Sequence, residues 1–385
     1  MKKLIIIGAN NFQLPLIKKA NEMGLETHVF AWEEGAVGKD FAHFFYPISI
    51  TEKETILEKA KLIIPNGIIS IGSDLAILTV SYVANELGLV GNSLECTNVS
   101  TNKFLMRERL NQNGLPCPRF TNCNEIDKIH ATNLHYPVIV KPTDRSGSRG
   151  VTKVNLSNEL GNAINRAMTE SFGKEIIIEE FIEGLEYSVE MISWQGNHHF
   201  LQITEKETSG APYFVEKGQH QPASVSNDIK QRIISIIKKS LSTLGVEYGA
   251  SHSEIIITKS NDIFITEIGA RMGGDYIGSD LVELSTGFDY VKSVINVSMG
   301  IFEGVRINES NYSGVYYCFP SPGKIIEIKD NSSSYSEVVR SEIYLKKGDF
   351  VPEIRESNHR PACFIYKSID RRFVPKDNLI EIITD

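Results

Sequence analysis

The chain has 385 residues, of which 23% are charged, and a formal net charge of −8. This length predicts two or three domains at roughly 100–200 residues each, the acidic balance argues against general nucleic-acid binding, and no apolar run approaches the ~20 residues of a membrane span. The five cysteines are scattered and form no CxxC pair, which indicates reduced thiols and a cytoplasmic location.

Residues 1 to about 95 alternate between strand and helix patterns. We predict strands at Leu4–Ile7, Thr27–Ala31 and Ile68–Ile71. We predict one helix at Leu14–Met23 and a second that begins at Ser73 and Asp74. Such alternation predicts a parallel sheet with helices on both faces. The first turn, Gly8–Asn11, lacks the later glycines of GxGxxG, so we favour a structural turn over a dinucleotide site.

A helix pattern over Thr101–Asn113 precedes two prolines that we interpret as a boundary between folding units. Lys103 on this helix would by itself be an ordinary solvated lysine. Strands and helices then mix irregularly up to about residue 300. Beyond about residue 305, short strands with turn signals predict a small β-rich domain. These strands are expected at Gly314–Phe319, Ile325–Ile328, Val338–Leu345 and Cys363–Lys367.

The stretch Val138–Val151, VIVKPTDRSGSRGV, has the ingredients of a phosphate-binding loop in an unusual order. An apolar strand ends at Lys141, a loop of small residues comes next, and Val151–Val154 alternates like a second strand. Glycine permits the positive φ with which backbone amides turn toward phosphate oxygens, and serine hydroxyls add donors. The candidate contacts are Ser146, Gly147, Ser148 and Gly150. A plain β-hairpin is the alternative, although a hairpin can also move and close as a lid over a nucleotide.

The stretch Ile176–Glu190, IIIEEFIEGLEYSVE, runs from a buried strand through a short connection into an alternating strand. A connector between two sheets offers backbone N–H and C=O groups to the edge of an adenine. The carboxylate of Glu186 is placed to accept hydrogen bonds from both ribose hydroxyls. A solvated acidic turn is the alternative interpretation.

Two apolar strands meet at the turn Ser260–Asp262, and their pairing would bring Glu254 and Glu267 nearly opposite each other. Facing carboxylates repel, by up to about 1 kcal/mol on an exposed sheet and more when buried. A divalent cation between them removes this cost, and oxygen ligands alone favour Mg²⁺ or Mn²⁺. Arg271 comes four residues after Glu267 and would face a phosphate held by that cation. The alternative is that the two glutamates point to opposite solvent faces.

The order of these features resembles the ATP-grasp superfamily over nearly the whole chain, most of all carboxylate–amine ligases of the dipeptide-ligase type. Carbamoyl phosphate synthetase, biotin carboxylase and purine-pathway enzymes are more distant. The resemblance implies an α/β and α+β multidomain fold. Its expected parts are a Rossmann-like domain over residues 1–100, a two-lobed ATP-grasp module over 101–304 with a lid lobe at about 115–182 and a catalytic lobe at about 183–304, and a β-rich domain over 305–385.

The resemblance also implies how ATP is held. Lys103 and Lys141 would contact the phosphates, and the 146–150 hairpin would close over them. In the EEFI segment Glu179 would lie near the adenine, Glu180 and Ile182 would bond it through their backbone, and Glu186 would bind the ribose.

The remaining implied roles concern the metal and the reacting phosphate. Glu254 and Glu267 would bind Mg²⁺ or Mn²⁺, and Arg271 would steady the reacting phosphate and carboxylate. The family's usual asparagine, two residues after the second glutamate, is Gly269 here. We therefore expect two protein ligands, with water and phosphates completing the metal's shell.

The implied reaction is amide formation from a small-molecule carboxylate and an amine, through an acyl phosphate, with release of ADP and phosphate. The polar stretch Thr204–Pro222 has a turn-rich composition and is expected to select the substrate. Glu216 is the candidate contact for the substrate amine. His220 is a second candidate, although a surface-loop histidine is the simpler interpretation. The resemblance also allows a homodimer.

Three other functions stay open at this stage. A carboxylase of the biotin-carboxylase or purine-pathway type would share the ATP site. A regulatory protein would bind ATP without turnover, although Lys103, Lys141 and both glutamates argue against a dead site. A protein that binds NAD or a nucleotide sugar would use the N-terminal domain instead.

Overall fold

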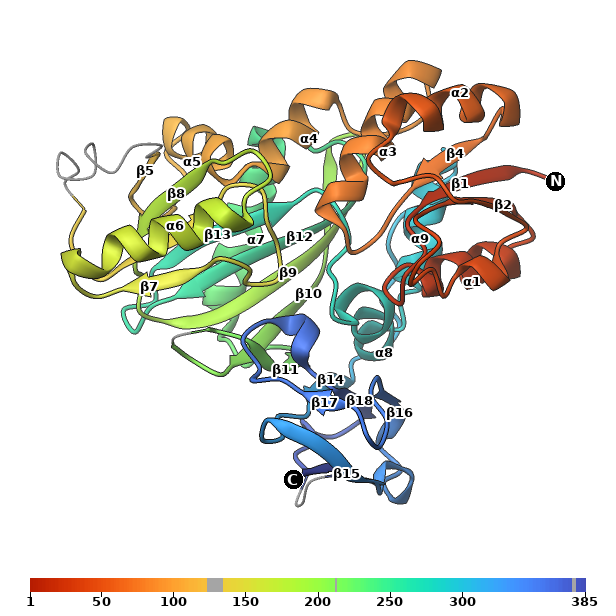
Figure 1. The fold of residues 1–385 in the computed structure, drawn as a ribbon. Coiled ribbons are helices and arrows are strands. Elements are labelled where there is room, and N and C mark those ends of the chain that lie inside the picture. Colours follow the sequence, from red (N-terminus) through yellow and green to blue (C-terminus); the bar gives the residue numbers. More distant parts are fainter. Residues whose placement is uncertain (123–133, 212, 376–378) are drawn as a thin grey trace.

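The computed structural model describes residues 1–122, 134–211, 213–375 and 379–385. The early part of the chain forms one unit around the N-terminus, the middle forms a large sheet with a small second sheet over it, and the C-terminal part, drawn in blue, lies at the bottom of the view (Figure 1). Within the described residues, no helix has the length and apolar character needed to cross a membrane.

The N-terminal unit is built on a four-stranded parallel sheet in the order β3-β2-β1-β4. The strands are β1 (Lys3–Ile7), β2 (Glu26–Phe30), β3 (Phe44–Tyr46) and β4 (Gly67–Ile69). Strand β1 is apolar and buried from Leu4 onward because both of its faces are covered. Leu4 and Ile6 pack on one side, and Ile5 and Ile7 belong to the core of the other side.

The helices that cover this sheet come from two distant parts of the chain. The early helices are α1 (Leu14–Glu22), α2 (Lys53–Ile63), α3 (Asp74–Leu87) and α4 (Leu94–Thr101). Helices α2 and α3 share a core with Ile5 and Ile7. The opposite core contains α1 together with α9 (Tyr290–Ser298), which comes from the far end of the predicted ATP-grasp module. The sequence pattern alone gave no indication that α9 returns to the first sheet.

A single residue interrupts the helix predicted over Thr101–Asn113. The side chain of Asn102 accepts hydrogen bonds from the amides of Phe104 and Leu105, and a new helix, α5 (Lys103–Gln112), begins there. Asparagine is a strong N-cap because its side chain replaces missing helical acceptors. Lys103 therefore lies in the first turn of α5, where the helix dipole disfavours a cation.

A small antiparallel sheet in the order β5-β8-β6-β7 forms the predicted lid lobe. Its strands are β5 (Phe120–Asn122), β6 (Val138–Pro142), β7 (Thr152–Val154) and β8 (Ile176–Glu180), and α6 (Leu160–Glu170) packs on them. Strands β6 and β7 pair antiparallel around the Ser/Gly loop, so the predicted hairpin is confirmed.

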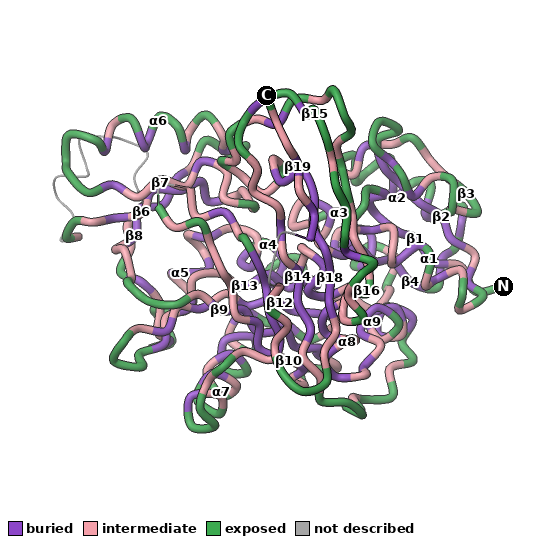
Figure 2. Tube along the Cα trace, turned by 90° about the horizontal axis from the view of Figure 1, so that it is seen from below, coloured by how far each residue is buried: buried purple, intermediate pink, exposed green. Residues whose placement is uncertain are grey.

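The large sheet has eight strands in the order β13-β12-β9-β10-β11-β14-β18-β16. Its strands are β9 (Leu185–Trp194), β10 (Asn197–Thr208), β11 (Glu216–Gln221), β12 (Gly249–Ile257), β13 (Ile263–Gly269), β14 (Tyr312–Tyr317), β16 (Val338–Ile343) and β18 (Ala362–Ser368). Helix α7 (Asn227–Thr243) packs against it through buried positions such as Ile233 and Ile237. Buried residues gather along the inner strands, while the outer sides of α6 and α7 are exposed (Figure 2).

The large sheet changes two expectations. The stretch Thr204–Pro222, predicted to be turn-rich, is mostly the end of β10 and the whole of β11. Strands β14, β16 and β18 continue the sheet beyond β11, so the predicted boundary near residue 305 falls between neighbouring strands of one sheet. The last third of the chain adds a small sheet of its own, formed by β15 (Gly323–Asp330), β17 (Phe350–Val351) and β19 (Ile380–Thr384).

Candidate active site

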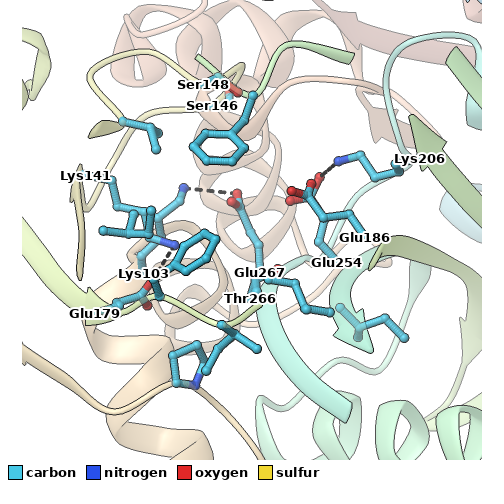
Figure 3. Close-up of a pocket in the computed structure, with 18 of the residues that line it drawn as sticks. Lys103, Lys141, Ser146, Ser148, Glu179, Glu186, Lys206, Glu254, Thr266 and Glu267 are labelled. Carbon is cyan, nitrogen blue, oxygen red and sulfur yellow. Dashed lines mark hydrogen bonds and ion pairs between the residues drawn. The ribbon is translucent and has the colours of Figure 1, made fainter. Parts of the chain in front are cut away.

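A cavity of about 220 Å³ lies between the lid sheet and the large sheet. It brings together most of the residues that the sequence singled out (Figure 3). The predicted residues that line it are Lys103, Lys141, Ser146, Gly147, Ser148, Glu179, Glu180, Ile182, Glu186, Glu216, Glu254, Glu267 and Arg271. The elements that supply them are far apart in sequence, so the cavity is a product of the tertiary fold.

Glu254 and Glu267 lie opposite each other on β12 and β13, as the strand pairing predicted. The register shifts immediately after this pair, between Glu254 and Ile255, where Thr266 is the extra residue on β13. Such a bulge re-aims side chains and is common beside active sites. Both glutamates and Thr266 line the cavity as a result.

Each of the two carboxylates has its own lysine in this structure. Lys103 Nζ lies 3.0 Å from Glu267 Oε1, and Lys206 Nζ lies 2.7 Å from Glu254 Oε1. Burial disfavours the ionised form of Glu254, but Lys206 and His252 together outweigh it and hold the pKa of this carboxyl well below its usual range. Lysines, and not only a cation, can therefore offset the repulsion that the sequence predicted.

The donor set fits a divalent cation with two protein ligands. The opposed carboxylates offer oxygen atoms only, which Mg²⁺ prefers, and both face the same cavity. Within the described ranges no group of three or more His, Cys, Asp or Glu side chains is placed to hold a metal ion. A cation here would therefore need oxygen ligands from water or a bound phosphate.

A cationic cluster lies beside Glu267 at the root of the hairpin. Lys103 is only 7% exposed, and its ammonium donates to the carbonyl of Arg145 as well as to Glu267. Lys141 is 8% exposed and lies 2.6 Å from Glu179. Burial, with Arg107 and Lys103 nearby, lowers the pKa of Lys141 despite the Glu179 carboxylate. An anionic ligand at this point would relieve the crowding of positive charge.

Glu179 has a role that the sequence did not predict. Its carboxylate is almost fully buried and pairs with Lys141 and, at 2.6 Å, with Arg107 Nε. Both of its oxygens therefore face cations, so its carboxylate is already occupied, and its place near an adenine stays a prediction. Arg107 is completely buried and also donates to the carbonyl of Thr266, so it ties the lid sheet to the bulge beside Glu267.

Aromatic and aliphatic side chains also line the cavity, among them Phe181, Ile182 and Phe214. Phe181 and Phe214 lie there with ring centroids 6.4 Å apart, and Lys153 stands 3.6 Å above the Phe181 ring. The amide of Glu180 already donates to the carbonyl of Arg119. A backbone contact between Glu180 and a base would therefore have to come from its carbonyl.

Arg271 lines the cavity, and its guanidinium is held by an ion pair with Asp74 of the N-terminal unit. Asp74 accepts from Arg271 Nε at 2.8 Å and from Nη2 at 3.0 Å. Burial disfavours both charges, but the mutual attraction lowers the pKa of Asp74 and raises that of Arg271. Ser73 caps helix α3 and thereby fixes Asp74 at its first position. The sequence predicted the start of this helix, but it did not predict that Asp74 pairs with Arg271.

The Arg271–Asp74 pair also explains the glycine at position 269. A Cβ atom on Gly269 would lie 3.2 Å from Arg271 Cζ and 3.4 Å from Asp74 Oδ1. A side chain at this position would therefore press on the Arg271 guanidinium, which would have to shift by a few tenths of an ångström.

We expect Gly269→Asn to lower kcat by about tenfold, because the new side chain would press on Arg271 and displace its guanidinium by a fraction of an ångström. ADP release at saturating ATP and Mg²⁺ measures the effect. Gly274→Asn is the matched control, since a Cβ there meets nothing within 4 Å. An increase in kcat or in metal affinity would instead mean that the asparagine completes the metal site.

A buried histidine, His252, lies between the carboxylates of Glu190 and Glu254. His252 and Glu190 are register partners on β12 and β9, with Nδ1 and Oε1 2.5 Å apart, and His252 Nε2 lies 3.4 Å from Glu254 Oε1. Burial disfavours the imidazolium, but the Glu190 carboxylate outweighs it and raises the pKa of His252 to about 9. The alternation of both strands places these three side chains on one face of the sheet.

Two predicted residues do not line the cavity. Gly150 has a φ of +73°, and a Cβ on it would approach Pro142 and Glu170, so it is a turn glycine packed at the base of the hairpin. His220 is buried in β11, where its Nδ1 lies 3.0 Å from the Tyr366 hydroxyl. We correct both expectations, because neither residue is turned toward the described lining.

Glu216 does line the cavity, but its carboxylate is shared with other groups. Lys206 lies 3.5 Å away, Arg360 lies 3.9 Å away, and the Ser357 hydroxyl donates at 3.0 Å. Sequence analysis missed several of the charged residues that organise the site. They are Asp74, Arg107, Glu190, Lys206 and His252, and their positions on ordinary helices and strands carry no motif.

The comparison with known protein families decides the identity of this region. Residues 134–280 match the family model described as ATP-grasp domain. This part of the chain is an ATP-grasp domain. The match starts within the lid lobe and ends just after Arg271, so it contains the hairpin, the connector and both opposed glutamates of the ATP-grasp domain.

Two curated relatives extend the similarity beyond the ATP-grasp domain. The chain is 24% identical to dapdiamide A synthase of Enterobacter agglomerans over 337 residues, which covers 81% of this chain and 77% of that protein. It is 26% identical to alanine–anticapsin ligase of Bacillus subtilis over 272 residues. That alignment covers 61% of this chain, which spans only a little more than half, 57%, of the relative's length.

A solved structure resembles the whole architecture. The L-amino acid ligase from Bacillus licheniformis superposes with a TM-score of 0.83 at 24% identity, and the superposition covers 96% of this chain and 94% of that one. At this level of identity the likeness establishes the fold around the ATP-grasp domain.

Proposed function

We propose that this protein is an ATP-dependent carboxylate–amine ligase that forms an amide through an acyl phosphate and releases ADP and phosphate. The observation that carries the proposal is the pair Glu254 and Glu267, opposed by strand register in the lining of the cavity. Lys103, Lys141 and the hairpin residues Ser146–Ser148 line the same cavity. The similarity to dapdiamide A synthase and to alanine–anticapsin ligase supports the same chemistry.

ATP would lie in the cavity with its base against the apolar side chains and its phosphates against the charged ones. Phe181, Ile182 and Phe214 would contact the adenine, and Glu186 would accept from the ribose hydroxyls. Burial and the neighbouring Glu254 and Glu216 raise the pKa of Glu186 despite Lys206. Hydrogen-bond donors from a ribose would therefore stabilise its ionised form.

Glu254 and Glu267 would hold Mg²⁺ or Mn²⁺, which when bound supplies positive charge to the triphosphate. Lys103 and Lys206 would then exchange their carboxylate partners for phosphate or substrate oxygens. The amides of the Ser146–Ser148 turn would face the phosphates, since Gly147 and Ser148 both adopt positive φ.

The chain's own contribution to catalysis is positioning and charge. A substrate carboxylate would attack the γ-phosphate, and an amine would then displace phosphate from the acyl phosphate. Lys141 and Arg271 would neutralise the negative charge that spreads over the transferring group. A closed hairpin would keep water away from the acyl phosphate.

We expect Lys141→Ala to raise the KM for ATP by at least about tenfold, because a charge-assisted bond to phosphate is lost. The ATP dependence of ADP release measures it. Lys259→Ala is the matched control, because its ammonium is in the exposed turn between β12 and β13. An unchanged KM would reject the phosphate role of Lys141.

The proposed function is tested by an ADP-release screen of carboxylate and amine pairs, with mass spectrometry of the product. We expect release only when both substrates are present, together with a condensed product heavier than either. Release that needs bicarbonate or aminoimidazole ribonucleotide would instead indicate a carboxylase of the biotin-carboxylase or purine-pathway type. Tight ATP binding without any release would indicate a regulatory protein.

We further infer the domain layout and location of this enzyme. The parallel sheet of residues 1–100 would be the Rossmann-like domain, followed by the module over 101–304 and the β-rich part over 305–385. Cys96, Cys117, Cys318 and Cys363 are free thiols in the described part of the chain, while Cys123 lies outside the described residues. Free thiols support a cytoplasmic location.

A further inference from the structure

Glu190, His252 and Glu254 form a row of charged side chains that runs from the interior of the large sheet to the ATP cavity. The register pairs His252 of β12 with Glu190 of β9, and Glu254 follows two residues further along β12. Residues two apart on a strand share one face of the sheet. The row begins at Glu190, which is fully buried, and ends at Glu254, which lines the cavity.

The burial of Glu190 is unfavourable, and a single cation offsets it. Among the described residues its carboxylate forms one ion pair, in which His252 Nδ1 lies 2.5 Å from Oε1. Ser188 adds a hydrogen bond of 3.4 Å to the same oxygen, while Oε2 is buried without a partner in the described structure. A buried ion pair is often no more stable than two well-packed apolar side chains. The stability of the sheet therefore does not explain why a carboxylate stands behind His252.

His252 joins the two carboxylates through both nitrogens of its ring. Nδ1 faces Glu190, and Nε2 lies 3.4 Å from Glu254 Oε1. An ionised carboxylate only accepts hydrogen bonds, so both ring nitrogens donate in this arrangement. The contact with Glu190 is the short one. It therefore sets the orientation of the ring, and the ring in turn donates to one chosen oxygen of Glu254.

His252 is the contact that would stay on Glu254 when a nucleotide binds. In this structure Lys206 Nζ also donates to Oε1, at 2.7 Å (Figure 3). The described hydrogen bonds of Glu254 thus all go to Oε1, which leaves Oε2 for a cation. Under the proposed function Lys206 turns to phosphate or substrate oxygens, and His252 alone then holds Oε1. Such a bond orients a metal-binding carboxylate, and its loss typically lowers metal affinity or activity 10–100-fold.

Gly273 leaves the room that this row needs. It follows Arg271 by two residues, and a Cβ atom on it would lie 2.8 Å from His252 Nδ1 and 3.1 Å from Glu190 Oε2. The nearer distance is too short for a real Cβ atom, so any other residue would displace the His252 ring. The backbone just after Arg271 is therefore packed directly on the pair of Glu190 and His252.

We propose that His252, held by Glu190, is a positioning residue that fixes Glu254 as a ligand of the divalent cation. The proposal rests on the proposed function, because it assumes the metal site of the ATP cavity. Glu190 holds the ring, the ring holds Oε1, and Oε2 is left for the cation. The two opposed glutamates then differ in their support. The one described ion pair of Glu267 is with Lys103, which is expected to exchange it for phosphate.

Two replacements of His252 separate positioning from a contribution to stability. Asparagine places an amide donor near the position of Nδ1 and keeps the contact with Glu190, whereas glutamine places one near the position of Nε2 and keeps the contact with Glu254. Both variants should have a lower Tm, and glutamine the lower of the two, because it leaves the buried Glu190 without this donor. Affinity for Mn²⁺ should follow the opposite order. We expect His252→Asn to bind Mn²⁺ at least about tenfold more weakly, and His252→Gln to stay within about threefold of the wild-type chain.

The experiment is a calorimetric titration of the full chain, saturated with ADP, with Mn²⁺, beside thermal unfolding of the same samples. ADP release gives kcat, which should fall at least about tenfold in His252→Asn together with the affinity for Mn²⁺. The assignment is overturned if His252→Gln binds Mn²⁺ as weakly as His252→Asn or more weakly. It is also overturned if neither variant differs from the wild-type chain, or if the wild-type chain with ADP binds no Mn²⁺.

Gly273→Ala tests the same row without removing any of its polar groups. The added methyl group should displace the His252 ring, so we expect the affinity for Mn²⁺ to fall about tenfold. Gly274→Ala is the matched control, since a Cβ there meets nothing within 4 Å. This pair decides the matter if the His252 variants do not fold, because equal affinities of the two alanine variants would overturn the assignment.

The role of His252 and the ligase function can fail separately. Mn²⁺ affinities in the expected order, without ADP release from any substrate pair, would reject the ligase and keep the role of His252. Amide formation by the wild-type chain, with His252→Asn unchanged in both Mn²⁺ affinity and kcat, would keep the ligase and reject the role of His252.

Discussion

Glu267→Gln is expected to lower kcat by about 10³-fold while the protein keeps its fold, the upper range for removing one electrostatic contact to the reacting group. The glutamine has the same size but cannot bind a divalent cation as an anionic ligand, and Lys103 loses its carboxylate partner. The side chain of Glu267 is partly exposed to the cavity, so the loss of this ion pair should change the free energy of unfolding by about 1 kcal/mol or less.

Three measurements check this expectation. ADP release gives kcat, a titration with Mg²⁺ shows whether metal affinity falls with it, and thermal unfolding shows whether the fold is kept. Glu183→Gln is the control, because its carboxylate is exposed and pairs only with Lys259 at 3.8 Å among the described residues. Normal turnover of Glu267→Gln would reject the metal assignment and with it the mechanism that we propose.

The local features of the site were predictable because short-range geometry fixes them. A tight turn at Ser260–Asp262 sets the register of β12 and β13, and one residue of slip would have turned Glu254 away from Glu267. The hairpin after Lys141 was predictable for the same reason, since an apolar strand, a Ser/Gly loop and a second strand form it.

The residues that tune the site were not predictable, because their partners lie far away in sequence. Asp74 and Arg271 are separated by 197 positions, and Arg107 and Thr266 by 159. Lys206 belongs to the stretch predicted to be turn-rich, whereas the structure places it on β10, paired with β11 in the large sheet. A helix or strand residue carries no local sign that its side chain will meet a charge on another unit.

The same limit explains the long-range topology. The pattern of α9 shows an apolar face, but nothing in it says that this face covers the N-terminal sheet. Strands β14 and β18 were predicted as strands, and only the fold shows that they extend the sheet of the ATP-grasp domain. One consequence is that Asp275 and Arg360 meet, although 85 positions separate them in the sequence.

Asp74→Asn is expected to lower kcat by about 10²-fold, the usual cost of misplacing a reacting group by about 1 Å. Asparagine keeps the size of the side chain but cannot hold both Nε and Nη2 of Arg271 with charged acceptors. Arg271 would then turn away from the phosphate. Because Asp74 is not among the described residues that line the ATP cavity, the KM for ATP should change by no more than about twofold.

A fall in kcat with an unchanged KM for ATP would mean that Asp74 orients Arg271, because a general loss of structure would also weaken ATP binding. Asp280→Asn is the matched control, since Asp280 pairs with Arg340 at 3.0 Å in a similarly buried position outside the ATP cavity. Asp74→Glu should recover part of kcat, because it restores the charge with one more methylene. If Asp280→Asn loses as much kcat as Asp74→Asn, or if the glutamate recovers nothing, Asp74 supports the fold and not the orientation of Arg271. If the expected split is found, the N-terminal unit takes part in the chemistry through one ion pair, and the ATP-grasp domain depends on it for an oriented arginine.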